Sequence, residues 1–247
     1  MTLSDGCTVI LPTYNEEENI GNMITTLRSM YPKFHIVVMD DNSKDRTKEI
    51  SESISKEDCM VQFFTRDVND KGLSASIFQG IIETKTKFFI NMDSDFQHPP
   101  SALRDIYERL NDGADLCIGI RDDRTALSFE RWVSSWIAHA MAMYTLKIRG
   151  KRASRDIMSG LFGGKTEMFG KVIRENEPEF ERVGFKALFD LMKYAPADIR
   201  IDEITFTFGK RRGGESKVSS KIIFSIMRQC GRLGKFVADV GESIRGN

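Results

Sequence analysis

Two aspartates, Asp93 and Asp95, have the type and spacing of metal ligands and directly follow a short apolar run. That run, residues 88–92, predicts a buried strand, and a double proline shortly after the aspartates prevents the strand from continuing. Because residues i and i+2 of a strand point to the same side, the two carboxylates can converge on one cation, and Gln97 adds a third oxygen. Hard divalent ions such as Mg²⁺ and Mn²⁺ prefer such oxygens, usually shared with a phosphate. An isolated Asp-x-Asp is more often a solvated turn, so the metal hypothesis depends on further motifs.

The composition argues against several other classes of protein. The 247 residues suffice for one large α/β domain, and 36 basic residues balance 36 acidic ones, which gives no overall field for nucleic acid. The four cysteines form no Cys-x-x-Cys pair, which argues against a zinc site or a disulfide framework. We find no signal peptide and no uncharged apolar run long enough to span a bilayer, so we expect a reducing, cytosolic setting.

The elements that would position the aspartates alternate between strands and helices. Three repeats of strand, loop and helix precede the run at 88–92, and such repeats form a parallel sheet with helices on both faces. We therefore predict an α/β fold with a mainly parallel central sheet. The predicted strands are residues 7–11, ended by Pro12, then 34–39, 61–64, 88–92 and 114–120, and the predicted helices begin near Asn15, contain Ile50 and Ile54, and span 73–83.

Polar residues follow three of these strands, and ligands bind outside the carboxyl ends of strands in such sheets. One crevice should therefore be lined by Tyr14 and Glu16, by Asp40 and Asp41, and by Asp93 and Asp95. The chain contains neither the glycine-rich dinucleotide fingerprint nor a P-loop. A bound diphosphate would therefore need a metal ion and basic side chains instead.

Seven ordered motifs carry a resemblance to a known family. They are PTYNE at 12–16, DDNSKDRT at 40–47, KGLSA at 71–75, DSDFQHPP at 93–100, GIR at 119–121, DIMSG at 156–160 and RRGGESK at 211–217. Together they resemble the family 2 glycosyltransferases with the GT-A fold, and most closely the synthases of the dolichol-phosphate mannose type, which make polyprenyl-phosphate sugars. The likeness covers about residues 6 to 222. Ile120 and Ser74 depart from it, since many relatives carry serine and some carry glycine there.

The resemblance implies a donor side and a metal site. A nucleotide-diphosphate sugar would be held by Pro12, Tyr14, Glu16, Met39 and Asp41, with Asp41 accepting a hydrogen bond from the base. Asp93, Asp95 and Gln97 would hold Mg²⁺ or Mn²⁺ against the diphosphate. Asp40 is expected to anchor its loop, and His98 to stabilise the metal loop.

The resemblance also implies an acceptor side in the second half of the chain. Arg131 with Ser135, one turn apart on a predicted helix, would contact an acceptor phosphate. Arg121, delivered by the strand at 114–120, matches a family motif on this side, and a salt-bridged loop with the charged residues that follow it is the alternative interpretation. Arg211, Arg212 and Lys217 flank a glycine pair and would neutralise both the leaving diphosphate and the acceptor. Asp190 falls where related enzymes carry an acid facing the acceptor. A hydroxyl acceptor would need it as general base, whereas a phosphate acceptor is already ionised. Asp156 is expected to be structural.

Two amphipathic segments predict contact with a membrane. Residues 129–146 carry Trp132 and Trp136 one turn apart, and packing against the sheet explains that segment equally well. We expect a catalytic domain at 1–215 and an amphipathic helical segment at 216–247 that faces a membrane or a partner. The protein should be peripheral on the cytoplasmic face of a membrane, directly or through a small membrane subunit.

The resemblance implies an inverting transferase that moves mannose or glucose from GDP-mannose or UDP-glucose to dolichyl or another polyprenyl phosphate. One alternative is a glycosyltransferase acting on a hydroxyl of a glycan or lipid, for which Asp190 would be essential. The other is a non-catalytic scaffold subunit of a membrane glycosylation complex.

Overall fold

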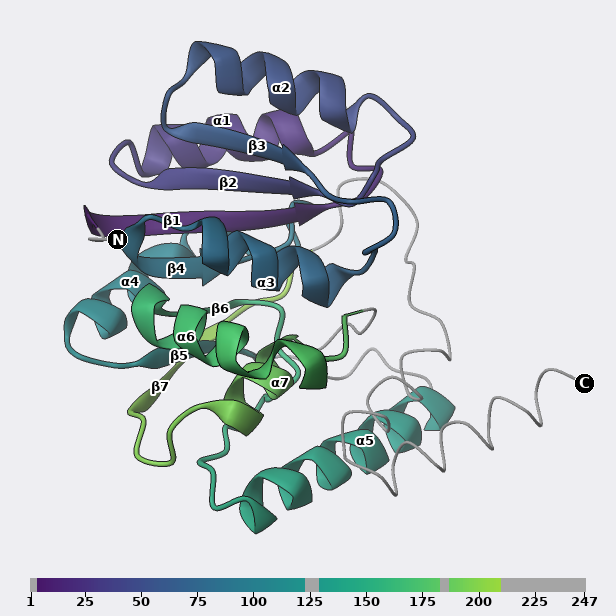
Figure 1. The fold of residues 1–247 in the computed structure, drawn as a ribbon, viewed down its shortest axis with the longest axis vertical. Helices are drawn as coiled ribbons and strands as arrows, with labels where there is room; N and C mark the ends of the chain where they lie inside the picture. Colours follow the sequence, from purple (N-terminus) through teal and green to yellow (C-terminus); the bar gives the residue numbers. More distant parts are fainter. Residues whose placement is uncertain (1–3, 123–128, 183–186, 210–247) are drawn as a thin grey trace, which may run out of the picture.

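A seven-stranded sheet forms the centre of the computed structural model, which describes residues 4–122, 129–182 and 187–209 (Figure 1). The strand order is β3-β2-β1-β4-β6-β5-β7. β6 is antiparallel to both its neighbours, and all other pairs are parallel, which confirms the predicted mainly parallel sheet. The strands are β1 Ser4–Thr13, β2 His35–Asp40, β3 Val61–Thr65, β4 Thr86–Asn91, β5 Leu116–Arg121, β6 Phe162–Lys165 and β7 Ile201–Phe206.

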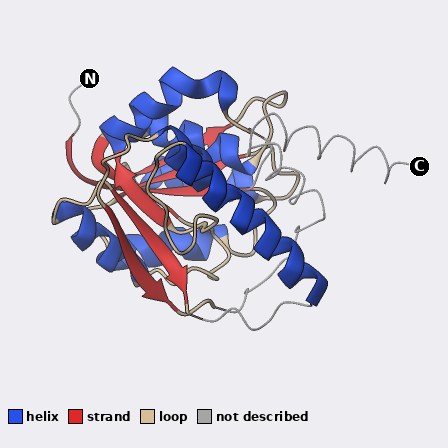
Figure 2. Ribbon diagram, turned by 90° about the horizontal axis from the view of Figure 1, so that it is seen from below, coloured by secondary structure: helices blue, strands red, loops and turns tan. Residues whose placement is uncertain are grey.

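Helices cover both faces of the sheet, as predicted (Figure 2). Neighbouring strand residues point to opposite faces, so Ile10 and Phe89 pack with α3, α6 and α7, whereas Val9 and Phe88 belong to the core beneath α1, α2 and α4. The helices are α1 Ile20–Met30, α2 Thr47–Glu57, α3 Leu73–Glu83, α4 Ala102–Asn111, α5 Phe129–Ile148, α6 Thr166–Asn176 and α7 Ala187–Tyr194, with a 3₁₀ turn at Glu177–Glu179.

β1 is longer than predicted, because Pro12 does not end it. The strand continues through Pro12 to Thr13, and both pair in register with β2. On the other side, pairing with β4 extends only to Ile10 opposite Asn91. The missing N–H of Pro12 therefore costs no ladder hydrogen bond on that side.

β6 was not predicted, and its glycines explain how it fits. A Cβ on Gly163 would lie 2.7 Å from the Phe89 carbonyl oxygen, and a Cβ on Gly164 would lie 2.7 Å from the Phe169 ring. Glycine is therefore required where this short strand enters between β4 and β5, although glycine weakens the sequence signal for a strand.

The long helix α5 spans the segment predicted to be amphipathic (Figure 1). The side chains of its first part, 129–138, lie outside the described residues. In its second part, Ala142 and Leu146 are buried in the core and the helix packs against α7, whereas Tyr144 and Ile148 are exposed. This half of α5 thus packs on the domain with one face and is open on another.

Within the described ranges, no helix combines the length and apolar character that crossing a bilayer requires. The predicted amphipathic segment at 216–247 lies outside those ranges. The domain boundary at residue 215 therefore stays a prediction.

Candidate active site

The loops after the parallel strands lie at one edge of the sheet, since parallel strands share the position of their carboxyl ends. The described non-glycine residues with positive φ, namely Asn15, Asn42 and Phe96, all lie in these loops, with φ between 53° and 64°. Residues in this region are uncommon outside tight turns. The loops after β1, β2 and β4 therefore turn sharply at the edge where the sequence predicted a crevice.

The loops after β1 and β2 are joined by hydrogen bonds. The Asn15 N–H donates to Ser43 Oγ at 2.9 Å, and the Lys44 N–H donates to Asn15 Oδ1 at 2.7 Å. The Glu16 N–H donates to Thr47 Oγ1 at 2.8 Å. These bonds hold the two predicted donor loops as one preorganised unit.

Asp40 anchors the second of these loops, which agrees with the role predicted for it. Its side chain is buried, and its carboxylate accepts hydrogen bonds from both the backbone N–H and the hydroxyl of Ser43. Both oxygens are therefore engaged within the loop. Asp40 holds the turn that presents Asp41.

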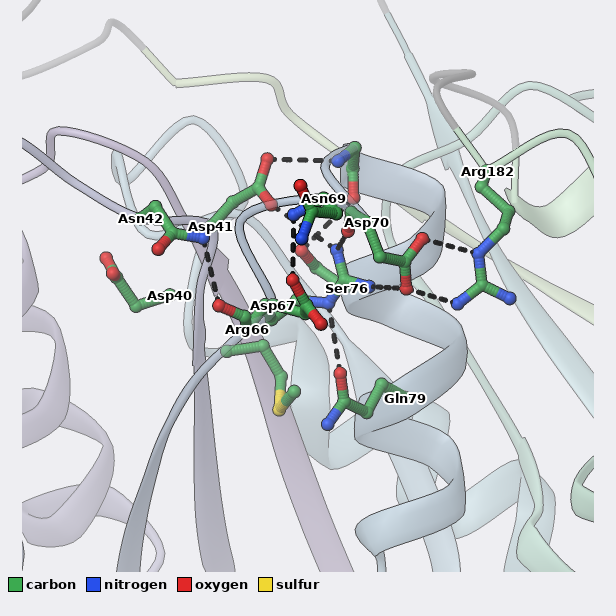
Figure 3. A network of polar contacts seen from close by, with 12 residues as sticks. Asp40, Asp41, Asn42, Arg66, Asp67, Asn69, Asp70, Ser76, Gln79 and Arg182 are labelled. Atoms are coloured by element: carbon green, nitrogen blue, oxygen red, sulfur yellow. Dashed lines mark hydrogen bonds and ion pairs between the residues drawn. The ribbon is translucent and has the colours of Figure 1, made fainter.

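Asp41 lies in a network of polar contacts around Arg66 (Figure 3). One carboxylate oxygen accepts the Gly72 N–H at 3.0 Å, and the other accepts Arg66 Nη1 at 3.3 Å. Partial burial raises the pKa of Asp41, while the Gly72 bond and the Arg66 charge oppose that rise. Each oxygen still has a lone pair available, so Asp41 has the capacity to accept a further N–H from a ligand.

Arg66 is a candidate site residue that the sequence did not reveal. Its side chain is only 1% exposed, and its guanidinium donates to Asp41, Asp70 and Gln79. It follows β3 directly, as Asp41 and Asp93 follow within two residues of their strands. Its position just after a predicted strand is the sequence feature that could have identified Arg66 as a candidate.

The described side chains predicted to bind the donor differ in accessibility. Tyr14 is 40% exposed at the edge of the sheet, where a ligand can reach its ring. Glu16 accepts a hydrogen bond from the Asn19 side chain at 2.9 Å. Pro12 is buried within β1, and Met39 is fully buried and packs near Gly80. Only backbone atoms of Met39 are therefore placed to meet a ligand.

The predicted metal ligands lie in the turn after β4. The Asp93 side chain is 40% exposed, whereas Asp95 is buried and its Oδ1 accepts the Gln97 N–H at 3.0 Å. The part of the chain that the structure describes contains no cluster of three or more His, Cys, Asp and Glu side chains able to hold a metal. Two carboxylates and an amide oxygen fit Mg²⁺ or Mn²⁺, whose remaining ligands are usually waters and substrate phosphates.

His98 supports the metal loop from behind. Its Nδ1 accepts the Asp93 N–H at 3.1 Å, so the proton of the neutral ring is assigned to Nε2. Burial lowers the pKa of His98 and so favours the neutral ring, although the Asp93 charge opposes this shift. Nε2 is buried without a hydrogen-bond partner among the described residues. The ring packs edge-on against Phe206 and Phe208.

The exit of β7 lies against the same loop. The Gly209 N–H donates to the Gln97 carbonyl at 2.9 Å, and the Arg121 guanidinium lies 4.2 Å from the centre of the Phe208 ring. The structure thus brings Arg121 and the metal loop together through the β7 exit. The predicted residues Arg211 and Lys217 lie outside the described residues. Arg131 and Ser135 lie on α5, and their side chains are not described.

Asp190 is not placed as an acid facing open solvent. It is fully buried in α7, where one carboxylate oxygen lies 2.7 Å from Lys193 Nζ and the other accepts the Glu181 N–H at 3.0 Å. A catalytic base must reach the proton it removes. This geometry favours a structural role for Asp190.

A family model described as "Glycosyl transferase family 2" matches residues 8–173, which span β1 to most of α6 and include Asp41, Arg66 and both metal-loop aspartates. The chain belongs to this family. It is therefore a glycosyltransferase, and the family resemblance expected from the motifs is confirmed.

Curated relatives match over nearly the whole chain. A dolichol-phosphate mannosyltransferase of Pyrococcus furiosus is 31% identical over 245 residues, which cover 96% of this chain and 66% of that protein. A dolichol-phosphate mannosyltransferase of Saccharomyces cerevisiae is also 31% identical, over 92% of this chain and 86% of its own length.

Solved structures agree on the fold. Glucosyl-3-phosphoglycerate synthase from Mycobacterium tuberculosis has a TM-score of 0.64 at 16% identity, covering 92% of this chain and 80% of that one. The same enzyme in complex with Mn²⁺, uridine diphosphate and glucosyl-3-phosphoglycerate has a TM-score of 0.63 at 17% identity, with the same coverage. Identities this low establish the fold alone, which confirms the predicted GT-A architecture.

Proposed function

We propose that the protein transfers a hexose, mannose or glucose, from a nucleotide-diphosphate sugar to dolichyl or another polyprenyl phosphate, with inversion at the anomeric carbon. The observation that carries this proposal is the arrangement at the sheet edge. The joined donor loops, the Asp93–Gln97 turn and Arg121, the last residue of β5, lie at the carboxyl ends of parallel strands. Relatives named dolichol-phosphate mannosyltransferase, similar over most of the chain, support the acceptor class.

The donor side binds and orients the sugar nucleotide. Asp41 accepts an N–H of the base, and the exposed ring of Tyr14 offers a flat face to the nucleoside. Asp93, Asp95 and Gln97 are the residues that would hold Mg²⁺ or Mn²⁺. When bound, such an ion supplies positive charge to the diphosphate.

The reaction needs little proton transfer. An oxygen of the acceptor phosphate attacks the anomeric carbon, the bond from that carbon to the diphosphate oxygen breaks, and the nucleoside diphosphate leaves with the electron pair. A phosphate monoester has its second pKa near about 6, so it is already a nucleophile at neutral pH. Arg121, with Arg131, Ser135, Arg211 and Lys217, would orient the anions and stabilise their charge.

The burial of Asp190 favours a phosphate acceptor over a hydroxyl acceptor. A hydroxyl would require a general base, and the acid predicted for that role is engaged with Lys193 and the Glu181 N–H. Transfer of the sugar to a phosphate acceptor does not need this base.

The acceptor class supports contact with a membrane, and so does the basic stretch formed by α5 and the residues after it. Residues 131–155 contain no acidic residue and six basic ones. Within them, Tyr144 and Ile148 are 66% and 67% exposed, one turn apart and next to Lys147. Basic residues near an anionic surface contribute about 1 kcal/mol each, so such a surface suits peripheral binding on the cytoplasmic face, directly or with a small membrane subunit.

Incubation with labelled donors tests the proposal. GDP-mannose, UDP-glucose and UDP-N-acetylglucosamine are each offered with polyprenyl phosphate and Mn²⁺, and the lipid phase is counted. We expect label in the lipid phase from one of the first two donors. Absence of lipid-linked label with all donors, in protein that binds nucleotide, would contradict the proposed acceptor.

A further inference from the structure

Two arginines from distant parts of the chain share the carboxylate of Asp70 (Figure 3). Arg66 follows β3, and its Nη2 lies 2.5 Å from Asp70 Oδ2. Arg182 stands 112 residues beyond Asp70, and its Nε lies 2.6 Å from Asp70 Oδ1, while its Nη2 contacts Oδ2. Asp70 therefore connects the donor half of the sheet to the segment that precedes α7.

Backbone contacts extend the same connection. The Ala75 N–H, in the first turn of α3, donates to the Arg182 carbonyl at 3.1 Å. Arg66 Nη1 also donates to the Asp70 carbonyl. Arg182 Nη1 also lies 2.9 Å from Glu177 Oε1, but the Glu177 side chain is 62% exposed. This ion pair therefore contributes little to holding Arg182 in place, compared with the pair that Arg182 forms with Asp70.

Charge balance makes Asp70 important for Arg66. A buried guanidinium requires counter-charge, and the carboxylate of Asp70 is nearer to Arg66 than that of Asp41, at 2.5 Å against 3.3 Å. With Asp70 neutral, Arg66 would have Asp41 as its remaining charged partner in this network. Asp41 would then be drawn toward Arg66 and away from the Gly72 N–H.

We propose that Asp70 and Arg182 are positioning residues for recognition of the donor's base. Together they fix Arg66, and Arg66 fixes the carboxylate of Asp41. The proposal rests on the proposed function in one respect, namely that Asp41 meets the base. Neither Asp70 nor Arg182 needs to touch the donor.

Titration calorimetry with three ligands tests this proposal. Affinities for GDP, UDP and inorganic pyrophosphate are measured with Mn²⁺ for Asp70→Asn, Arg182→Gln and the double variant. Substitutions along a coupling network typically change affinity by roughly 2- to 30-fold. We expect a loss in this range for the preferred nucleoside diphosphate and no change for pyrophosphate, which has no base.

The order of the variants is also predicted. Asp70→Asn should lose more than Arg182→Gln, because it deprives both arginines of their partner and leaves them facing each other. The double variant should resemble Asp70→Asn alone, since Arg182 acts through Asp70. Arg182→Lys, which keeps one charged donor, should restore part of the affinity. Asp67→Asn is the matched control, because it is the same change on the same loop at an exposed residue whose carboxylate accepts the Asn69 N–H.

Two results would overturn the proposal. Unchanged nucleotide affinity in folded Asp70→Asn would show that the bridge does not position Asp41. An equal loss for pyrophosphate and nucleotide would show general loosening rather than base recognition. If the wild-type protein bound GDP, UDP and pyrophosphate with equal affinity, the site would not recognise a base. That result would contradict the proposed function itself, whatever the variants do.

Discussion

Replacing His98 with phenylalanine should damage the metal loop without unfolding the protein. His98→Phe keeps a ring between Phe206 and Phe208 but removes the acceptor of the Asp93 N–H. An amide left without an acceptor costs about 1–3 kcal/mol when buried. The substitution also removes the buried Nε2–H, which has no partner among the described residues, and so regains a similar amount. We therefore expect a stability change within about 1 kcal/mol, because these two effects oppose each other.

The effect on ligand binding should be larger. Residues that orient metal ligands typically change metal affinity by about 10- to 100-fold when mutated. We expect His98→Phe to weaken Mn²⁺-dependent binding of a nucleoside diphosphate by about tenfold or more, at the low end of that range. Titration calorimetry with and without EDTA measures this loss, and urea denaturation measures stability.

His98→Asn is the matched control with the opposite pattern. The asparagine Oδ1 can occupy the position of Nδ1 and still accept the Asp93 N–H, whereas the ring contacts with Phe206 and Phe208 are lost. We expect reduced stability, by about 1–3 kcal/mol, with metal-dependent affinity largely kept. Full metal-dependent affinity in His98→Phe, or the same pattern in both variants, would refute the argument.

Three further predictions concern packing, charge and pH. Gly163→Ala places a Cβ 2.7 Å from the Phe89 carbonyl oxygen and should destabilise the fold by about 1–3 kcal/mol in urea denaturation, whereas Gly170→Ala, whose Cβ meets only the end of Arg174, should not. Asp190→Asn removes the carboxylate that lies 2.7 Å from the buried Lys193 Nζ and should cost about 3–5 kcal/mol of stability. Turnover per folded molecule should fall far less than the about 10²–10⁴-fold expected for a lost general base, and Arg131→Ala should show the reverse. The hydrogen bond from Arg182 holds the pKa of Asp70 below its ordinary value. Asp70 therefore contributes to the free energy of unfolding above the ordinary pKa, and this contribution is lost as the pH falls through the lowered pKa. The free energy of unfolding of Asp70→Asn should therefore fall less steeply with decreasing pH than that of the wild type, and an equal slope would contradict this.

Most of the fold was predictable because its signals are local. The helix predicted at 73–83 is α3 Leu73–Glu83. The helix predicted to begin near Asn15 is α1, which begins later, at Ile20, and buries Ile20, Met23, Ile24 and Leu27 at helical spacing. β6 carries the opposite local signal, since its two glycines are needed only because β4, α4 and α6 approach closely. That requirement exists in three dimensions alone. For the same reason, the sequence could not show that the pairing of β1 with β4 ends at Ile10 and leaves Pro12 unpaired on that side.

The candidate site was predictable where residues follow strands in recognisable motifs, as Asp41, Asp93 and Asp95 do. Arg66 was missed because its partners Gln79, Asp70 and Asp41 come from three segments, and nothing local distinguishes it from a surface arginine. The surroundings of Asp190 could not be predicted for a related reason. Its buried ion pair with Lys193, one turn away, resembles an exposed helical pair in sequence.

A competition between two acceptors tests the central claim most directly. The wild-type protein is given labelled donor, Mn²⁺ and equal amounts of a polyprenyl phosphate and the corresponding polyprenol, and the lipid products are separated. We predict that label enters only the phosphate-linked product, that EDTA abolishes it, and that Asp95→Ala, although folded, yields none. Label on the polyprenol, or undiminished transfer by Asp95→Ala in EDTA, would contradict the account.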